Sequence, residues 1–274
     1  MKQQQGVWEA CGLRLQTRWW GAAAGSAPVW ILLHGFAGSA AAWEPVVKHL
    51  PLNRCYIGVD LPGHGGSAWP KQGLTLQDVA KALAVMLQTL ALGPVTLIGY
   101  SLGGRLALQL ALGYPEGVGH LMLVSTSPGV AGATERDERR ERDGRWADLL
   151  REEGMAGFIA QWDEQALFNG GRSLDDVQRA WWRELRLAQD PEGLAQAIAA
   201  FSPGREPYVG PALSQCLLPT ELVVGANDAR YVTWGETMRD EMRASRLHVL
   251  DGVAHNVPLE TPNELAQVML GSLI

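Results

Sequence analysis

Six short apolar runs, each followed by glycine or a polar residue, most constrain how this chain can fold. They are too short for helices, and continuous apolar character is typical of strands buried on both faces of a parallel sheet. Helical patterns such as Leu76–Leu90 and Ser101–Gly113 lie between them. This alternation predicts an α/β fold with a mostly parallel central sheet flanked by helices. The runs are Val29–Leu33, Cys55–Val59, Val95–Ile98, Leu121–Val124, Glu221–Val224 and Arg246–Leu250.

The segment 128–200 interrupts the alternation. It is highly charged, its pattern is helical, and no strand-like run occurs in it. Helices inserted between two strands of such a sheet can cover its carboxyl edge. We therefore predict a core built from residues 1–127 and 201–274, with a helical lid over 128–200.

Composition narrows the class of protein. The net charge of −6 disfavours nucleic acid as a partner, because phosphate binding needs an excess of basic residues. No apolar run approaches the roughly 18–20 residues that span a bilayer, and the first residues do not resemble a signal peptide. Three scattered cysteines favour neither a disulfide framework nor a metal site. We expect a cytoplasmic protein without a membrane span or metal; the oligomeric state stays open.

The run Gly99-Tyr100-Ser101-Leu102-Gly103 follows an apolar strand and opens a helix. In this G-x-S-x-G pattern the glycines let strand and helix approach closely, and the serine is held out of a strained turn. A chance glycine-rich turn is the alternative, but the strand before and the helix after disfavour it. We predict Ser101 as the reactive residue, with the Leu102 amide beside it.

Two further residues complete a catalytic triad in the order Ser, Asp, His that accompanies this pattern. Asp228 comes shortly after the strand-like Leu222–Val224, and His255 follows Leu247–Leu250. Asp251 is the competing acid, but it lies only four residues before His255 and is better placed to support the turn. These motifs are typical of the α/β-hydrolase fold.

The loop His34-Gly35-Phe36 follows another predicted strand. In α/β hydrolases this loop supplies the second amide that stabilises an oxyanion, so we assign that amide to Phe36. His34 and His64 are predicted to be structural, through hydrogen bonds that hold their loops. None of the histidines has metal-ligand spacing.

Arg105 lies four residues after Ser101, on the same face of the predicted helix. A charge in a mostly buried helix is costly without an anionic partner. The partner could be a lid carboxylate or a carboxylate of the substrate, and the sequence leaves both open.

Several segments resemble the family of 2-succinyl-6-hydroxy-2,4-cyclohexadiene-1-carboxylate synthases, the pyruvate-releasing enzymes of menaquinone biosynthesis. The resemblance extends from about Val29 to Pro262 and includes the lid, which is its more discriminating part. The matching segments are His34–Gly38, Asp60–Ser67, Gly99–Arg105, Pro128–Val130, Glu135–Trp146 and Phe158–Trp162.

The resemblance implies a cofactor-free lyase that eliminates pyruvate from 2-succinyl-5-enolpyruvyl-6-hydroxy-3-cyclohexene-1-carboxylate, a small molecule with several carboxylates. Ser101 would act as a base activated by His255. By position the resemblance implies the triad Ser101, Asp228 and His255, the oxyanion amides of Phe36 and Leu102, and substrate contacts from Tyr100, Arg105, Arg139, Trp162, Phe168 and Arg186.

Plainer interpretations remain beside these. Arg139 could belong to a series of Glu-to-Arg pairs four residues apart on a solvated helix, with Glu135 as its partner. Arg186 could be an exposed helix charge, and Trp162 could simply anchor the lid. The same triad would also serve an esterase or carbon–carbon bond hydrolase with Ser101 as nucleophile, or persist in a small-acid receptor without turnover.

Overall fold

The computed structural model of the chain describes residues 3–25, 27–168 and 170–271. Its centre is an eight-stranded sheet in the order β1-β2-β4-β3-β5-β6-β7-β8. Strands β3 to β8 are parallel to one another. Strands β1 and β2 form an antiparallel hairpin, and β2 pairs antiparallel with β4. The strands are β1 (Gln3–Ala10), β2 (Leu13–Gly21), β3 (Val29–Leu33), β4 (Cys55–Val59), β5 (Val95–Tyr100), β6 (Val118–Val124), β7 (Thr220–Gly225) and β8 (Ser245–Leu250).

The predicted α/β fold and its six strands are confirmed. Burial on both faces is wrong for β8, which is only partly buried because it lies at the edge of the sheet. The two strands before these six were not assigned individually, because β2 alternates between buried and more exposed residues instead of running continuously apolar. Strands β3, β4 and β7 are buried along their whole length, as expected of strands covered on both faces.

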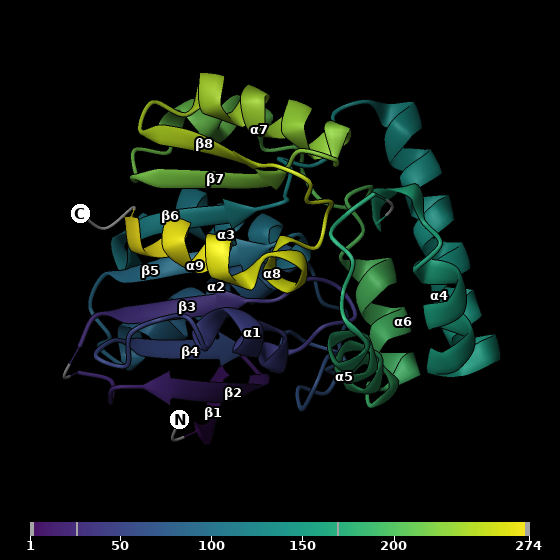
Figure 1. Cartoon of the computed structure of the whole chain (residues 1–274), viewed down its shortest axis with the longest axis horizontal. Coiled ribbons are helices and arrows are strands. Elements are labelled where there is room, and N and C mark those ends of the chain that lie inside the picture. The colour runs from purple at the N-terminus through teal and green to yellow at the C-terminus, as the bar shows by residue number, and fades with distance from the viewer. Residues whose placement is uncertain (1–2, 26, 169, 272–274) are drawn as a thin grey trace.

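Helices cover both faces of the sheet, and Figure 1 shows the two layers. One face carries α1 (Glu44–Val47), α8 (Val257–Glu260) and α9 (Pro262–Gly271). The other carries α2 (Leu76–Thr89), α3 (Leu102–Gly113) and α7 (Ala229–Glu241). Two separate apolar clusters form the core, one between each helical layer and the sheet.

A block of helices covers the carboxyl ends of the strands, on the right in Figure 1. It consists of α4 (Ala133–Trp162), α5 (Asp176–Leu187) and α6 (Pro191–Ala200). Helix α4 is kinked at Gly154, whose φ of 64° leaves the helical region. Among the described residues of 128–200 there is no strand, so the helical character predicted for this segment is confirmed; we call the segment the lid and keep its limits as a prediction.

The lid has a small apolar core of its own, in which α4 packs along α6. Leu150 and Phe158 of α4 and Leu194 of α6 are fully buried there. Phe36 and Ala37 of the sheet domain join this cluster, so the lid is packed onto the loop that follows β3. No helix in the described part of the chain is long and apolar enough to cross a membrane.

Candidate active site

Ser101 occupies a strained turn between β5 and α3. Its φ of 51° and ψ of −109° lie outside the regions that most residues adopt. The turn needs glycine on both sides: a Cβ on Gly99 would lie 2.2 Å from the Gly103 carbonyl oxygen, and one on Gly103 would lie 2.2 Å from that of Leu33. The backbone itself therefore fixes where the serine hydroxyl stands.

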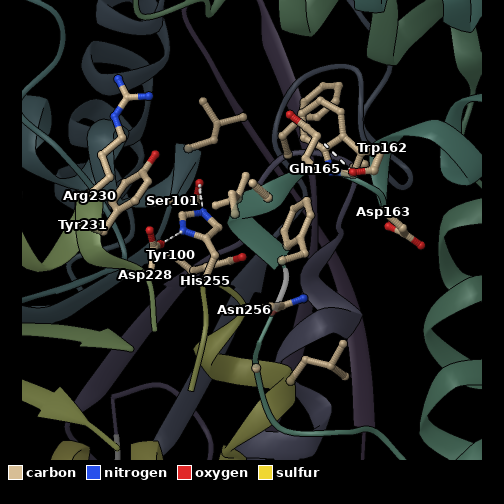
Figure 2. A pocket seen from close by; sticks show the side chains of 18 of the residues that line it. Tyr100, Ser101, Trp162, Asp163, Gln165, Asp228, Arg230, Tyr231, His255 and Asn256 are labelled. Atoms are coloured by element: carbon tan, nitrogen blue, oxygen red, sulfur yellow. Dashed lines mark hydrogen bonds and ion pairs between the residues drawn. The ribbon is translucent and has the colours of Figure 1, made fainter. Parts of the chain in front are cut away.

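Ser101, His255 and Asp228 form a continuous hydrogen-bonded relay (Figure 2). The Ser101 Oγ lies 3.1 Å from Nε2 of His255, and Nδ1 of the same ring lies 2.7 Å from Oδ2 of Asp228. Asp228 and His255 are buried, with 5% and 3% of their surface exposed. The three predicted triad residues are thus brought together. Asp251 is exposed, and its carbonyl oxygen accepts a hydrogen bond from Arg172.

Two residues that sequence reasoning missed hold the histidine in place. The Glu260 carboxylate accepts hydrogen bonds from the amides of Ala254 (2.8 Å) and Asn256 (3.0 Å), on either side of His255. The ring of Tyr231 lies 4.5 Å from the imidazole, centroid to centroid. Both lie a few residues beyond triad members in sequence, but nothing in their spacing distinguishes them from neighbouring residues.

The structural role predicted for His34 and His64 agrees with their contacts. His34 is buried; its Nε2 accepts from the Leu61 amide at 3.0 Å, and its Nδ1 lies 2.8 Å from the Gly35 carbonyl oxygen. Burial lowers the pKa of His34. Burial, helped by the charge of His34, lowers the pKa of His64 to about 3. Both rings therefore stay neutral and serve the loops that shape the site.

The amides of Leu102 and Phe36, predicted to hold an oxyanion, belong to residues that line the cavity above Ser101. Leu102 is the first residue of α3, so its amide has no intrahelical acceptor. Phe36 follows Gly35, where a Cβ would lie 2.6 Å from the Tyr100 ring; only glycine lets this loop approach the turn so closely. Their role as oxyanion donors stays a prediction.

The relay opens into a cavity of about 1180 Å³ between the sheet and the lid. Aromatic side chains form part of its wall. The ring centroids of Trp162 and Phe36 are 5.3 Å apart, and those of Phe168 and His255 are 6.0 Å apart. The Tyr100 ring is 5.5 Å from His255. Burial, followed by the charge of Glu260, raises the pKa of Tyr100, so its hydroxyl stays protonated.

Arg105 lines this cavity and also has an internal partner, Glu206. Its guanidinium donates to the Glu206 carboxylate and, at 3.0 Å, to the Phe201 carbonyl oxygen. The Arg105 side chain is 12% exposed and that of Glu206 is 3% exposed. Burial raises the pKa of Glu206, although Arg105 opposes the shift. The salt-bridge alternative for Arg105 is therefore realised, with an acid just beyond the predicted lid instead of within it.

Arg139 and Arg186 line the cavity too, and each holds an acid of the lid. Arg139 Nε donates to Asp143 Oδ2 at 2.7 Å, so the expected pairing with Glu135 is wrong. Arg186 makes two bonds to Asp163, of 2.5 and 2.7 Å. It is only 4% exposed, which corrects the alternative of an exposed helix charge. Substrate binding by these arginines stays a prediction.

No group of three or more His, Cys, Asp or Glu side chains that could hold a metal ion occurs in the part of the chain that the structure describes. The chemistry available from the site's own groups is proton transfer or nucleophilic attack through the serine, in a large pocket rich in arginine and aromatic side chains.

Comparisons with known proteins agree with this geometry. Residues 28–197 match the family model described as the alpha/beta hydrolase fold. The 2-succinyl-6-hydroxy-2,4-cyclohexadiene-1-carboxylate synthase of Salmonella paratyphi C is 33% identical over 248 residues, covering 89% of this chain and 94% of the relative. A Bacillus subtilis relative, which carries the same name provisionally, is 32% identical over 241 residues, covering 87% of this chain and 88% of the relative.

Among solved structures, MenH from S. aureus is similar with a TM-score of 0.89 and 27% identity, covering 94% of this chain and 97% of that one. A thermophilic esterase from Thermogutta terrifontis is similar with a TM-score of 0.79 and 26% identity over 98% of each chain. With its fold, its relay and these relatives, the chain belongs to the alpha/beta hydrolase fold family and, within it, to the family of 2-succinyl-6-hydroxy-2,4-cyclohexadiene-1-carboxylate synthases.

Proposed function

We propose that the chain is a lyase that eliminates pyruvate from 2-succinyl-5-enolpyruvyl-6-hydroxy-3-cyclohexene-1-carboxylate, giving 2-succinyl-6-hydroxy-2,4-cyclohexadiene-1-carboxylate in menaquinone biosynthesis. One observation carries the proposal: the buried relay of Ser101, His255 and Asp228 opens into an arginine-rich cavity in a chain of the synthase family.

The relay supports proton abstraction. Asp228, bonded to Nδ1 of His255 at 2.7 Å, fixes the tautomer in which Nε2 faces the serine and can accept its proton. Ser101 then removes the proton next to the succinyl ketone, and the electrons released shift through the ring and break its bond to the enolpyruvyl oxygen. The leaving group is the enolate of pyruvate, which takes up a proton on carbon to become pyruvate. No bond between enzyme and substrate is needed, so the serine acts as a base.

The negative charge that develops on the ketone oxygen requires fixed donors. The amides of Phe36 and Leu102 are the candidates, because such donors are preorganised and one of them is typically worth about 10²–10³ in rate. The protonated Tyr100 hydroxyl is a further donor at the cavity wall.

The substrate carries several carboxylates, and the cavity is lined by arginines from both the lid and the sheet domain. We propose a small polyanionic substrate and a cytoplasmic location. The location is supported by the three cysteines, which are free in the structure, since disulfides are typical of oxidising compartments.

The second candidate is an esterase or carbon–carbon bond hydrolase. The serine–histidine distance of 3.1 Å is compatible with it, because this distance suits nucleophilic attack as well as it suits proton abstraction. Because the chain is also similar to a solved esterase, the experiment measures ester cleavage as well.

The test is to mix the purified protein with the enolpyruvyl-cyclohexene substrate and follow pyruvate release, with p-nitrophenyl acetate in parallel. We expect rapid pyruvate release and negligible ester cleavage. Ser101→Ala should lower kcat by about 10³-fold or more, since it removes the base, while a substrate analogue still binds. The control Ser173→Ala removes another cavity hydroxyl and should change little. Ester cleavage without pyruvate release would instead assign the hydrolase.

A further inference from the structure

Arg142 on α4 and Arg230 on α7 line the cavity and, like Arg183 on α5, have no acidic partner in the described part of the chain. Among the described residues, neither guanidinium makes an ion pair or a hydrogen bond. Arg142 comes from the lid and Arg230 from the layer of helices beside the sheet (Figure 1). We call them the seam pair.

The seam pair contrasts with the arginines whose charge is already used. Arg105, Arg139 and Arg186 line the same cavity, but each donates to a carboxylate of the protein. An arginine already paired in this way must share or release its acid before it can bind a substrate carboxylate in a bidentate manner. Arg142 and Arg230 have all their donors available.

The two guanidinium groups are close enough to influence one another. Burial, followed by the charge of Arg139, lowers the pKa of Arg142, and the charge of Arg230 lowers it further. The charge of Asp143 opposes this shift. Asp143 is bonded to Arg139 Nε at 2.7 Å and is almost fully buried. It therefore offsets the charge of Arg139 and leaves the seam pair with an excess of positive charge.

Arg230 of the seam pair also lies beside the catalytic relay. Arg230 comes two residues after Asp228 at the start of α7. Its neighbour Tyr231 packs on the His255 ring at 4.5 Å. In Figure 2 Arg230 and Tyr231 lie side by side next to the relay, with the guanidinium directed away from Asp228. A carboxylate held there would therefore belong to the same substrate molecule whose acidic C–H group faces Ser101.

Both arginines are exposed, so water solvates their charges in the free protein, and a carboxylate bound between them would replace like-charge repulsion by attraction. A carboxylate has two oxygens and can accept from both guanidinium groups at once through charge-assisted bonds. The cavity thus favours an anionic ligand that bridges the lid and the sheet domain.

We propose that Arg142 and Arg230 together bind one carboxylate of the substrate, so that the lid and the sheet domain each supply half of a single anion site. The proposal rests on the proposed function for the identity of the substrate. It makes the seam pair a determinant of specificity: polyanionic substrates are held at both the relay and the seam, whereas a neutral ester lacks the second contact.

The experiment measures pyruvate release for Arg142→Gln, Arg230→Gln and the double variant. The control is Arg145→Gln on the same helix, since Arg145 is an exposed partner of Glu141 and does not line the cavity. Each seam variant should raise KM about tenfold, equal to about 1.4 kcal/mol, with kcat within about twofold. Because one carboxylate contacts both arginines, the free-energy change calculated from the KM of the double variant should be much smaller than the sum of the two single changes. Arg230→Lys should restore part of the loss, and thermal unfolding should show that each variant folds.

A second readout separates this proposal from the proposed function. Succinate, a dicarboxylate probe, is titrated calorimetrically into wild type and each variant. If wild type releases pyruvate but the seam variants keep its KM, the seam site is overturned and the lyase stands. If wild type releases no pyruvate, the proposed lyase function is wrong, and succinate binding then tests the seam site. Weaker succinate binding in the seam variants than in the control supports that site. Equal binding in all variants, or none to wild type, overturns it.

Discussion

The catalytic relay and the arginines around it occupy the same cavity but are determined in different ways. Ser101, Asp228 and His255 follow strands β5, β7 and β8. The carboxyl ends of parallel strands meet at one edge of a sheet, so residues placed there in sequence also meet in space. The arginines lie on helices. The spacing of residues on a helix predicts contacts three and four residues away, but it does not predict a partner on another helix or loop. Arg105 finds Glu206, 101 residues away.

The difference is one between backbone and side-chain control. The relay is held by turns that only glycine permits and by hydrogen bonds of the main chain, such as those that the Glu260 carboxylate accepts. The arginines are held by other side chains, so their pairing depends on how the lid packs. Substitutions should therefore act most strongly where the backbone is constrained, less strongly at a buried pair, and least at an exposed one.

The largest effect is expected for Gly99→Ala. Its Cβ would lie 2.2 Å from the Gly103 carbonyl oxygen and 2.6 Å from the Gly104 amide nitrogen, and backbone atoms cannot move aside cheaply. We expect the free energy of unfolding to fall by about 4 kcal/mol or more, in the range reserved for severe structural conflicts, and activity to be lost. Urea unfolding measures this. Gly113→Ala, at the end of helix α3, meets nothing within 4 Å and should not destabilise; equal effects at the two sites would contradict backbone control.

Arg105→Met should have the next largest effect, because it leaves Glu206 buried without its cation. We expect the free energy of unfolding to fall by about 3 kcal/mol at pH 8. Burial already raises the pKa of Glu206 above its usual value of 4.5, and losing Arg105 raises it further. A raised folded-state pKa means that stability falls as pH rises from the unfolded to the folded value, so the loss should be smaller at pH 5.

The control for the Arg105 prediction is the double variant Arg105→Met with Glu206→Leu. Replacing a buried ion pair by apolar side chains is often neutral, so this variant should regain most of the stability and lose the added pH dependence. A double variant no more stable than the single one would show that the pair itself, and not the stranded charge, matters.

Glu260→Gln should lower kcat about tenfold, equal to about 1.4 kcal/mol in the barrier. One amide oxygen cannot accept from both Ala254 and Asn256 as the two carboxylate oxygens do, so the loop that carries His255 loosens. Initial rates of pyruvate release at saturating substrate test this, with KM expected to stay nearly constant. A change in KM alone would mean that Glu260 acts on the cavity instead of on the histidine.

Arg145→Ala should have the smallest effect, within about 0.5 kcal/mol of wild type. Both members of its pair with Glu141 are well exposed, at 66% and 74%, so water replaces the lost bond. Thermal unfolding at low and high salt measures it. A loss as large as that of Arg105→Met would erase the distinction between buried and exposed pairs on which the comparison depends.

The sequence alone predicted the α/β fold, the parallel strands, the helical segment over the sheet edge and the three relay residues. These depend on patterns local to the chain: continuous apolar runs, glycines in a tight turn, and polar residues directly after strands. The antiparallel hairpin of β1 and β2 lacked such a pattern, because its second strand is only partly buried.

Only the tertiary structure decided which acids the arginines meet and which arginines keep their charge free. Glu206, Asp163 and Asp143 had no distinguishing mark in the sequence, and neither had Glu260 or Tyr231 near the histidine. A buried charge must find an opposite charge, but many acids satisfy that requirement equally well before the chain folds. Packing of the lid against the sheet domain selects among them, and so determines that Arg142 and Arg230 face the cavity without a partner.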